Sequence, residues 1–198
     1  MKRGWKRFWQ LASAATLALG TIGVNAISAV PAAPGTKPHR HNELTLAGLR
    51  PGSSKVLPAT KLAGFGAPRA TPTGYSWSNR CEGGVLDVEI DKDRVAQTVT
   101  ASLLGSRSPA DCDGQGGERL HGSLRTGRGL ELGDLCRRAV GLYGEPESRS
   151  PSVRGANKLE LLFYSFDWAG DNVPQSMEVS CDATRHRVVE ITLAFPTL

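Results

Sequence analysis

The sequence has few large core-forming side chains. Aromatic residues make up 6% of its 198 residues, whereas it holds 23 Gly and 12 Pro. A chain with 39% hydrophobic and 22% charged residues has the composition of a globular protein, which excludes a collagen-like, coiled-coil or wholly disordered chain. The composition therefore permits one or two small domains with thin cores.

An excess of basic residues is also missing outside the N-terminus. The formal net charge is +5, with 24 Lys and Arg against 19 Asp and Glu, but Lys2, Arg3, Lys6 and Arg7 stand together at the start of the chain. Removing those four from the 24 leaves 20 basic residues against 19 acidic ones. A nucleic-acid-binding protein needs a basic surface that neutralises phosphates, so we expect no nucleic-acid partner.

Recognisable catalytic motifs are absent. Beyond residue 32 the only histidines are His39, His41, His121 and His186, and none lies in a G-x-S-x-G nucleophile elbow. His39 and His41 lie in a Pro-rich stretch without further ligands, so we expect a solvated tail rather than a metal site. Asp87 and Glu89 lie on the outer face of a predicted strand, which gives no sign of an acid/base pair. We therefore predict a protein that is not an enzyme and that holds no cofactor or metal.

The N-terminal residues 1–32 are typical of a secretory signal peptide. A basic start is followed by an uncharged stretch from Phe8 to Val30 and by small residues that fit cleavage after Ala26 or, as we favour, after Ala32. An uncleaved anchor spanning residues 11–30 is the alternative. No Cys lies near these positions, which excludes a lipoprotein anchor. We predict export to the periplasm or the extracellular space, without stable membrane insertion after cleavage.

The four cysteines all lie in the exported part, where an even number favours two disulfides over free thiols. In an antiparallel meander, Cys81 at the end of the first strand lies near Cys112, which follows the third strand. Cys136 lies on a predicted short helix, and Cys181 lies on the apolar face of a predicted strand. Of the three possible connectivities we therefore predict Cys81 with Cys112 and Cys136 with Cys181.

Two segments of the chain resemble each other. Gly48-Leu49-Arg50-Pro51-Gly52 corresponds to Gly129-Leu130-Glu131-Leu132-Gly133, and each is followed by a helical stretch and then by strands. We predict an α+β fold of two tandem units, each a short helical segment packed on a small antiparallel β-meander. The units cover residues 44–105 and 120–198, preceded by a flexible lead-in at 33–43 and separated by a disulfide-bearing linker at 106–119.

The elements within these units follow from periodicity and punctuation. Leu86, Val88 and Ile90 alternate with three acidic residues, as in a strand that is buried on one face. Asp134 is the predicted N-cap of the second helix, which ends before Gly144. Because Pro58 is tolerated only in a first turn, the first helix is expected to start at Ser54 or later.

Residues 158–168 predict a strand that is apolar on both faces. Leu159, Leu161 and Phe163 share one face and are expected to meet the helix, whereas Leu162, Tyr164, Phe166 and Trp168 share the other. A strand of this kind must be covered on both sides. The aromatic residues either seal the junction between the two units or form an open binding face together with Tyr75 and Trp77.

This pattern resembles the beta-lactamase inhibitor protein family and the related small outer-membrane-lipoprotein domain. The residues that carry the resemblance are Gly129-Leu130-x-Leu132-Gly133-Asp134, Val140, Gly144-x-Pro146 and Val188-Val189-Glu190-Ile191, with a weaker first copy at Gly48 to Gly52, Gly66-x-Pro68 and Val95 to Thr100. The resemblance implies a joined sheet surface that grips an enzyme. It implies contacts from Tyr75, Trp77, Tyr164, Phe166 and Trp168 and from the Asp91 to Arg94 turn.

We therefore expect a secreted or periplasmic non-catalytic protein-binding module that binds another envelope or extracellular protein. The alternatives are a secreted enzyme inhibitor resembling the beta-lactamase inhibitor protein and a cell-envelope assembly factor. The sequence does not predict an oligomeric state.

Overall fold

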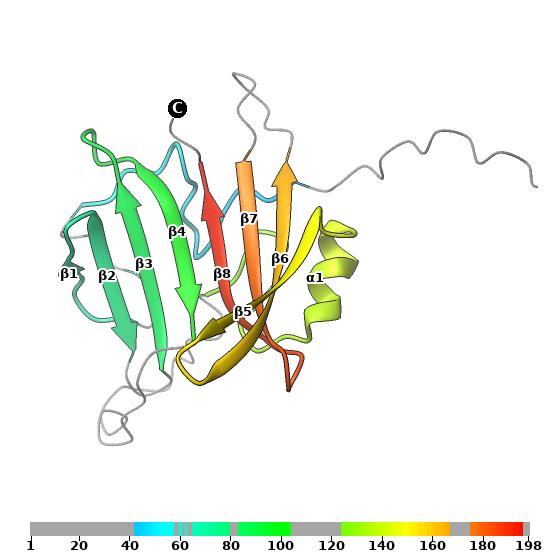
Figure 1. Cartoon of the computed structure of the whole chain (residues 1–198). Coiled ribbons are helices and arrows are strands. Elements are labelled where there is room, and N and C mark those ends of the chain that lie inside the picture. The colour runs from blue at the N-terminus through cyan, green and yellow to red at the C-terminus, as the bar shows by residue number, and fades with distance from the viewer. Residues whose placement is uncertain are drawn as a thin grey trace, which may run out of the picture. The chain divides into compact units, whose positions relative to one another are not determined.

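The computed structural model describes residues 42–57, 60, 62, 65–79, 83–103, 124–166 and 175–195. These residues form one antiparallel sheet with a short helix on one face (Figure 1). The strands are β1 (Arg69–Ala70), β2 (Gly74–Asn79), β3 (Gly84–Ile90), β4 (Ala96–Ser102), β5 (Ser148–Arg154), β6 (Asn157–Phe166), β7 (Gln175–Asp182) and β8 (Val188–Ala194), and the helix is α1 (Cys136–Tyr143).

The eight strands follow the order β1-β2-β3-β4-β8-β7-β6-β5. Two runs of antiparallel neighbours therefore meet at the central pair of β4 and β8, whose register runs from Thr98 opposite Ala194 to Ser102 opposite Glu190. Thr100 and Thr192 face each other in this pair with their hydroxyl oxygens 3.1 Å apart. The two runs thus share one continuous sheet.

This arrangement corrects the predicted fold class. Two tandem α+β units, each with its own helix on a meander, are wrong, because the described residues form a single eight-stranded antiparallel sheet with one short helix. The pairing of β4 with β8 joins segments about ninety residues apart in the sequence. Local periodicity carries no information about such a pairing, since each strand alternates in the same way with either neighbour.

The helix side of the sheet holds the core. On β3 the buried Leu86 and Val88 alternate with the exposed Asp87 and Glu89, as the sequence predicted. The helix contributes Cys136, Ala139 and Tyr143 to the same core. Trp77 on β2 has no exposed surface. The core is therefore one layer that extends from β2 to β6 and leaves the two edge strands β1 and β5 exposed.

Two loop segments complete the cover of this side, and they make corresponding hydrogen bonds. The amide of Gly52 donates to the carbonyl of Ala96 at 2.7 Å, and the amide of Gly133 donates to the carbonyl of Val188 at the same distance. Both glycines have positive φ angles, of 75° and 88°. The two loops are therefore fixed against the starts of β4 and β8. The internal repeat and its domain boundaries stay predictions.

A buried carboxylate joins these two loops. Glu43 is 2% exposed, and its oxygens accept hydrogen bonds from the amides of Gly127 at 3.1 Å and Arg128 at 2.9 Å. The hydroxyl of Tyr143 also donates to Glu43, at 2.8 Å, and lies 2.7 Å from the hydroxyl of Thr126. Burial raises the pKa of the Tyr143 hydroxyl above its ordinary value. This cluster ties α1 to both loops.

The helix predictions are confirmed for one segment and wrong for the other. α1 lies where the second helix was predicted, but Leu135 is its N-cap, and the carboxylate of Asp134 instead accepts a hydrogen bond from the amide of Glu131. The described residues between Ser54 and the start of β1 hold no helix. Ser54 and Val56 instead hydrogen-bond to the chain at residues 94–96, in an extended course that suits the Pro-containing segment.

The disulfide between Cys136 and Cys181 is confirmed. It joins α1 to β7 across a Cα–Cα distance of 6.1 Å and thus fixes the helix on this face of the sheet. Cys81 and Cys112 lie outside the described residues, as do the predicted signal peptide and most of the lead-in. Among the described residues, no helix is long and apolar enough to cross a membrane.

β6 turns the opposite face towards the helix from the one that the sequence predicted. Leu162 and Tyr164 lie opposite Val179 and Met177 in the register, and these residues share the helix side with the tethered Cys181. Leu159 is buried, Leu161 is half-buried, and Phe163 is 37% exposed. The prediction that this set meets the helix is wrong, because the larger aromatic set fills the core.

Candidate functional site

The face of the sheet opposite α1 carries mostly small hydroxyl and acidic side chains. The register places Asp87 and Glu89 on this face beside Thr100 and Thr98. Glu178 on β7 lies opposite Thr192 of β8 on the same face. Alternation puts these residues on the open face, because their neighbours in each strand are buried in the core.

The sheet curls around this face. β5 lies three strands from β8 in the sheet order, a separation of about 14 Å in a flat sheet. Nevertheless, the guanidinium of Arg154, at the end of β5, forms an ion pair with the carboxylate of Glu190 on β8. Figure 1 shows the β5–β6 hairpin sweeping across the near side of the sheet towards the lower ends of β4 and β8. The face is therefore concave.

The concave face holds a hollow of about 460 Å³, which we call the acidic groove. The residues that define it here are Asp87, Glu89, Thr98, Thr100, Arg154, Glu178, Glu190 and Thr192. They come from both halves of the sheet. Four carboxylates and one guanidinium line the groove, so it is acidic although the whole chain carries a net charge of +5.

Only one of these carboxylates is bonded within the described part of the chain. Glu190 is 6% exposed, and it accepts hydrogen bonds from Arg154 and from the hydroxyl of Ser180. The hydrogen bond to Glu190 raises the pKa of Arg154. Asp87, Glu89 and Glu178 have no hydrogen-bond or ion-pair partner among the described residues. These three carboxylates therefore face the groove without a direct bond to a cation from the described part of the chain.

An apolar surface adjoins the acidic groove. Phe163 on β6 lies opposite Glu178 in the register and is 37% exposed, and Leu161 lies opposite Ser180. Both residues share the open face, because their pairing partners on β7 do. The concave face therefore combines carboxylates and hydroxyls with an exposed aromatic ring at one side.

The predicted partner-binding aromatic residues lie elsewhere. Trp77, Tyr164 and Phe166 are at most 1% exposed and belong to the core. The rings of Tyr164 and Phe166 stack with centroids 6.2 Å apart. Buried in this way, these three side chains offer a partner no surface. Tyr75 is half-buried and borders the acidic groove, and Trp168 lies outside the described residues.

The turn between β3 and β4, which the resemblance assigned to partner contact, is internally bonded. A carboxylate oxygen of Asp91 accepts hydrogen bonds from the amides of Asp93 at 2.8 Å and Val95 at 2.9 Å, and Arg94 has a φ of 61°. These bonds hold a tight exposed hairpin. Nothing in the geometry distinguishes it from an ordinary turn.

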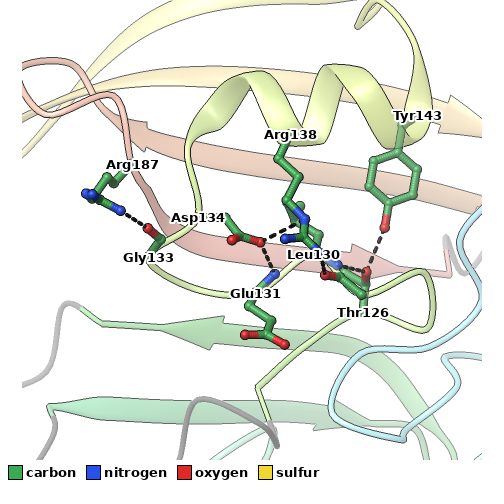
Figure 2. A network of polar contacts seen from close by, with 9 residues as sticks. Thr126, Leu130, Glu131, Gly133, Asp134, Arg138, Tyr143 and Arg187 are labelled. Carbon is green, nitrogen blue, oxygen red and sulfur yellow. Dashed lines mark hydrogen bonds and ion pairs between the residues drawn. The ribbon is translucent and has the colours of Figure 1, made fainter.

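A second hollow, of about 590 Å³, lies on the helix side and is bordered by several arginines. Arg149 there contacts Glu145 and Glu160 at 3.0 and 3.5 Å. Figure 2 shows the loop beside it, where Arg138 reaches Asp134 and Arg187 donates to the carbonyl of Gly133. Arg138 and Arg187 thus bond to the loop, and Arg149 is already paired with carboxylates. We place the candidate site on the concave face.

Sequence reasoning identified part of this site and missed the rest. Asp87 and Glu89 were recognised as an outer strand face, but Glu178, Glu190 and Arg154 were not connected with them. The alternation of Glu178 and Ser180 with buried residues was the available signal. Only the curl of the sheet brings Arg154 to Glu190, and no sequence period encodes it. No group of three or more potential metal ligands gathers among the described residues.

Comparisons with protein-family models, curated proteins and solved structures find no match to this chain. The resemblance to the beta-lactamase inhibitor protein family thus stays a prediction.

Proposed function

We propose that this chain is an exported, non-catalytic protein-binding module whose acidic groove binds a basic segment of another protein. The observation that carries the proposal is the set of four carboxylates gathered on one concave sheet face from strands of both halves. A surface of one charge sign attracts a partner of the other sign and repels the wrong ones. The partner is therefore an envelope or extracellular protein that presents lysine or arginine.

The shape of the face supports a protein segment over a small ligand. The groove is open to solvent, and the hydroxyls of Thr98, Thr100 and Thr192 line it, so it is not an enclosed apolar pocket. Such hydroxyls offer donors and acceptors to a polypeptide backbone. Phe163 adds an exposed aromatic contact at the side, which is a common anchor in protein interfaces.

The compartment and the charge support the same proposal. A disulfide such as Cys136–Cys181 persists in an oxidising compartment outside the cytosol. An acidic groove repels phosphate, which argues against a nucleic-acid ligand.

The test is an affinity capture from the host's envelope and culture fractions, in which the captured protein is identified and its affinity measured. The variant Asp87→Lys with Glu178→Lys reverses two groove charges. The control variant Glu131→Lys with Glu145→Lys changes the net charge by the same amount on the helix side. Circular dichroism of all three proteins shows that each is folded.

We expect the groove variant to bind the partner about tenfold or more weakly than the wild type, because two attractive charges become repulsive. The control variant should bind as the wild type does. Equal binding by the groove variant and the wild type would refute the proposed face.

A further inference from the structure

One basic side chain already occupies the acidic groove. Arg154 lies at the end of β5, and its guanidinium pairs with Glu190 on β8 although two strands lie between them. Glu178 also lies close enough to stabilise the charge of Arg154. The chain thus places its own cation where the proposed partner would place one.

The pairing compensates a carboxylate that needs a cation. Glu190 is 6% exposed, and apart from Arg154 its hydrogen-bond partner among the described residues is the Ser180 hydroxyl, at 3.3 Å. A carboxylate buried this far is costly unless a positive charge pairs with it. Glu190 therefore selects for a guanidinium or an ammonium group in the groove.

The hairpin that carries Arg154 is held loosely otherwise. Residues 153–158 are all exposed, and the Arg154 side chain itself is 53% exposed. Among the described residues, the ion pair with Glu190 is the one side-chain hydrogen bond from the tip residues 154–157 to the rest of the sheet. Gly155 has a φ of 60° and forms the tight turn. The tip can therefore leave the groove without breaking other side-chain bonds.

We infer that Arg154 is an internal occupant of the acidic groove, and that an arginine of the partner displaces it from Glu190 on binding. This inference rests on the proposed function and adds the chemistry of the partner and its control. Because the planar guanidinium of Arg154 fits this position, arginine is the partner residue that the groove takes best. The β5–β6 hairpin then opens as the partner segment enters.

Because Arg154 is part of the chain, it competes with the partner in every molecule. The apparent affinity equals the affinity of the open groove multiplied by the fraction of molecules whose groove is open. If the ion pair closes the groove in roughly ten of every eleven molecules, its removal tightens binding about tenfold. A charge lost elsewhere on β5 has no such effect.

The test measures binding of a short oligo-arginine peptide with blocked ends by isothermal titration calorimetry at low ionic strength. The variants are Arg154→Ala and Arg154→Met, of which the second keeps the apolar stem of the side chain and protects the fold. Arg149→Ala is the matched control, since it removes an arginine from the same strand that points to Glu145 and Glu160 instead. Glu190→Gln combined with Arg154→Met removes both charges.

Both Arg154 variants should bind the peptide about tenfold more tightly than the wild type, and Arg149→Ala should match the wild type. The Glu190→Gln, Arg154→Met variant should lose the gain. Suppose that the Arg154 variants bind the peptide no more tightly, while the Asp87→Lys, Glu178→Lys variant still weakens partner capture. The claim that Arg154 competes with the partner is then refuted, and the proposed function stands. If reversing the groove charges leaves partner capture unchanged as well, both proposals fail.

Discussion

The buried carboxylate of Glu43 gives a sharp test of how the two loops are held. Replacing Glu43 with Ala removes the acceptor of five hydrogen bonds, from four amides and the hydroxyl of Tyr143. Gly127 and Tyr143 keep a second partner, in the carbonyl of Thr45 and the hydroxyl of Thr126. The amides of Leu44, Thr45 and Arg128 keep no acceptor among the described residues.

Three donors that lose their acceptor cost about 1 kcal/mol each in net terms. We therefore expect Glu43→Ala to lower the free energy of unfolding by about 3 kcal/mol. Urea denaturation followed by circular dichroism measures this change. Glu145→Ala is the matched control, because the Glu145 side chain is 70% exposed and its loss should cost under about 0.5 kcal/mol. A loss below about 1 kcal/mol for Glu43→Ala would refute the reasoning.

Three further changes test the fold. Replacing Cys136 and Cys181 with Ala opens a loop of 45 residues and should cost about 4 kcal/mol in urea denaturation; a loss below about 1 kcal/mol would contradict the tether. Burial raises the pKa of Tyr143 above its ordinary 10.0. The free energy of unfolding is therefore unaffected by Tyr143 ionisation below that pH, and above it falls by up to about 1.4 kcal/mol per pH unit, because the unfolded chain ionises first. In Tyr143→Phe the urea midpoint should fall less steeply above pH 10 than it does in the wild type. An equally steep fall would refute the claim that Tyr143 causes it. Gly74→Ala places a Cβ 1.9 Å from a backbone carbonyl oxygen of β3 and should cost about 1 to 3 kcal/mol, whereas Gly66→Ala meets nothing within 4 Å and should leave the melting temperature unchanged.

Local patterns predicted local structure well. The alternation of Leu86 and Val88 with acidic residues predicted the buried and open faces of β3. The position of Cys181 on the apolar face of its strand predicted the disulfide with Cys136 on the helix. The helix at 136–143 followed from spacing and from Gly144. Each of these depends on neighbours within one or two elements.

Local patterns predicted neither the long-range strand pairing nor the curl of the sheet. The pairing of β4 with β8 depends on which strand edges remain open after the hairpins form, and this decides between two units and one sheet. On β6 both faces are apolar, so the pattern could not tell which one meets α1. The ion pair between Arg154 and Glu190 depends on a curl that spans several strands. The acidic groove therefore becomes visible only in three dimensions.

Photo-crosslinking is the most direct test of the claim that the concave face is the binding surface. A photoreactive residue replaces Thr100 on the floor of the groove in one protein and Gly141 on α1 in another, where an added side chain meets no atom within 4 Å. The account predicts that the captured partner crosslinks to position 100 and not to position 141. Crosslinks at position 141 alone would contradict it and would place the partner on the helix side.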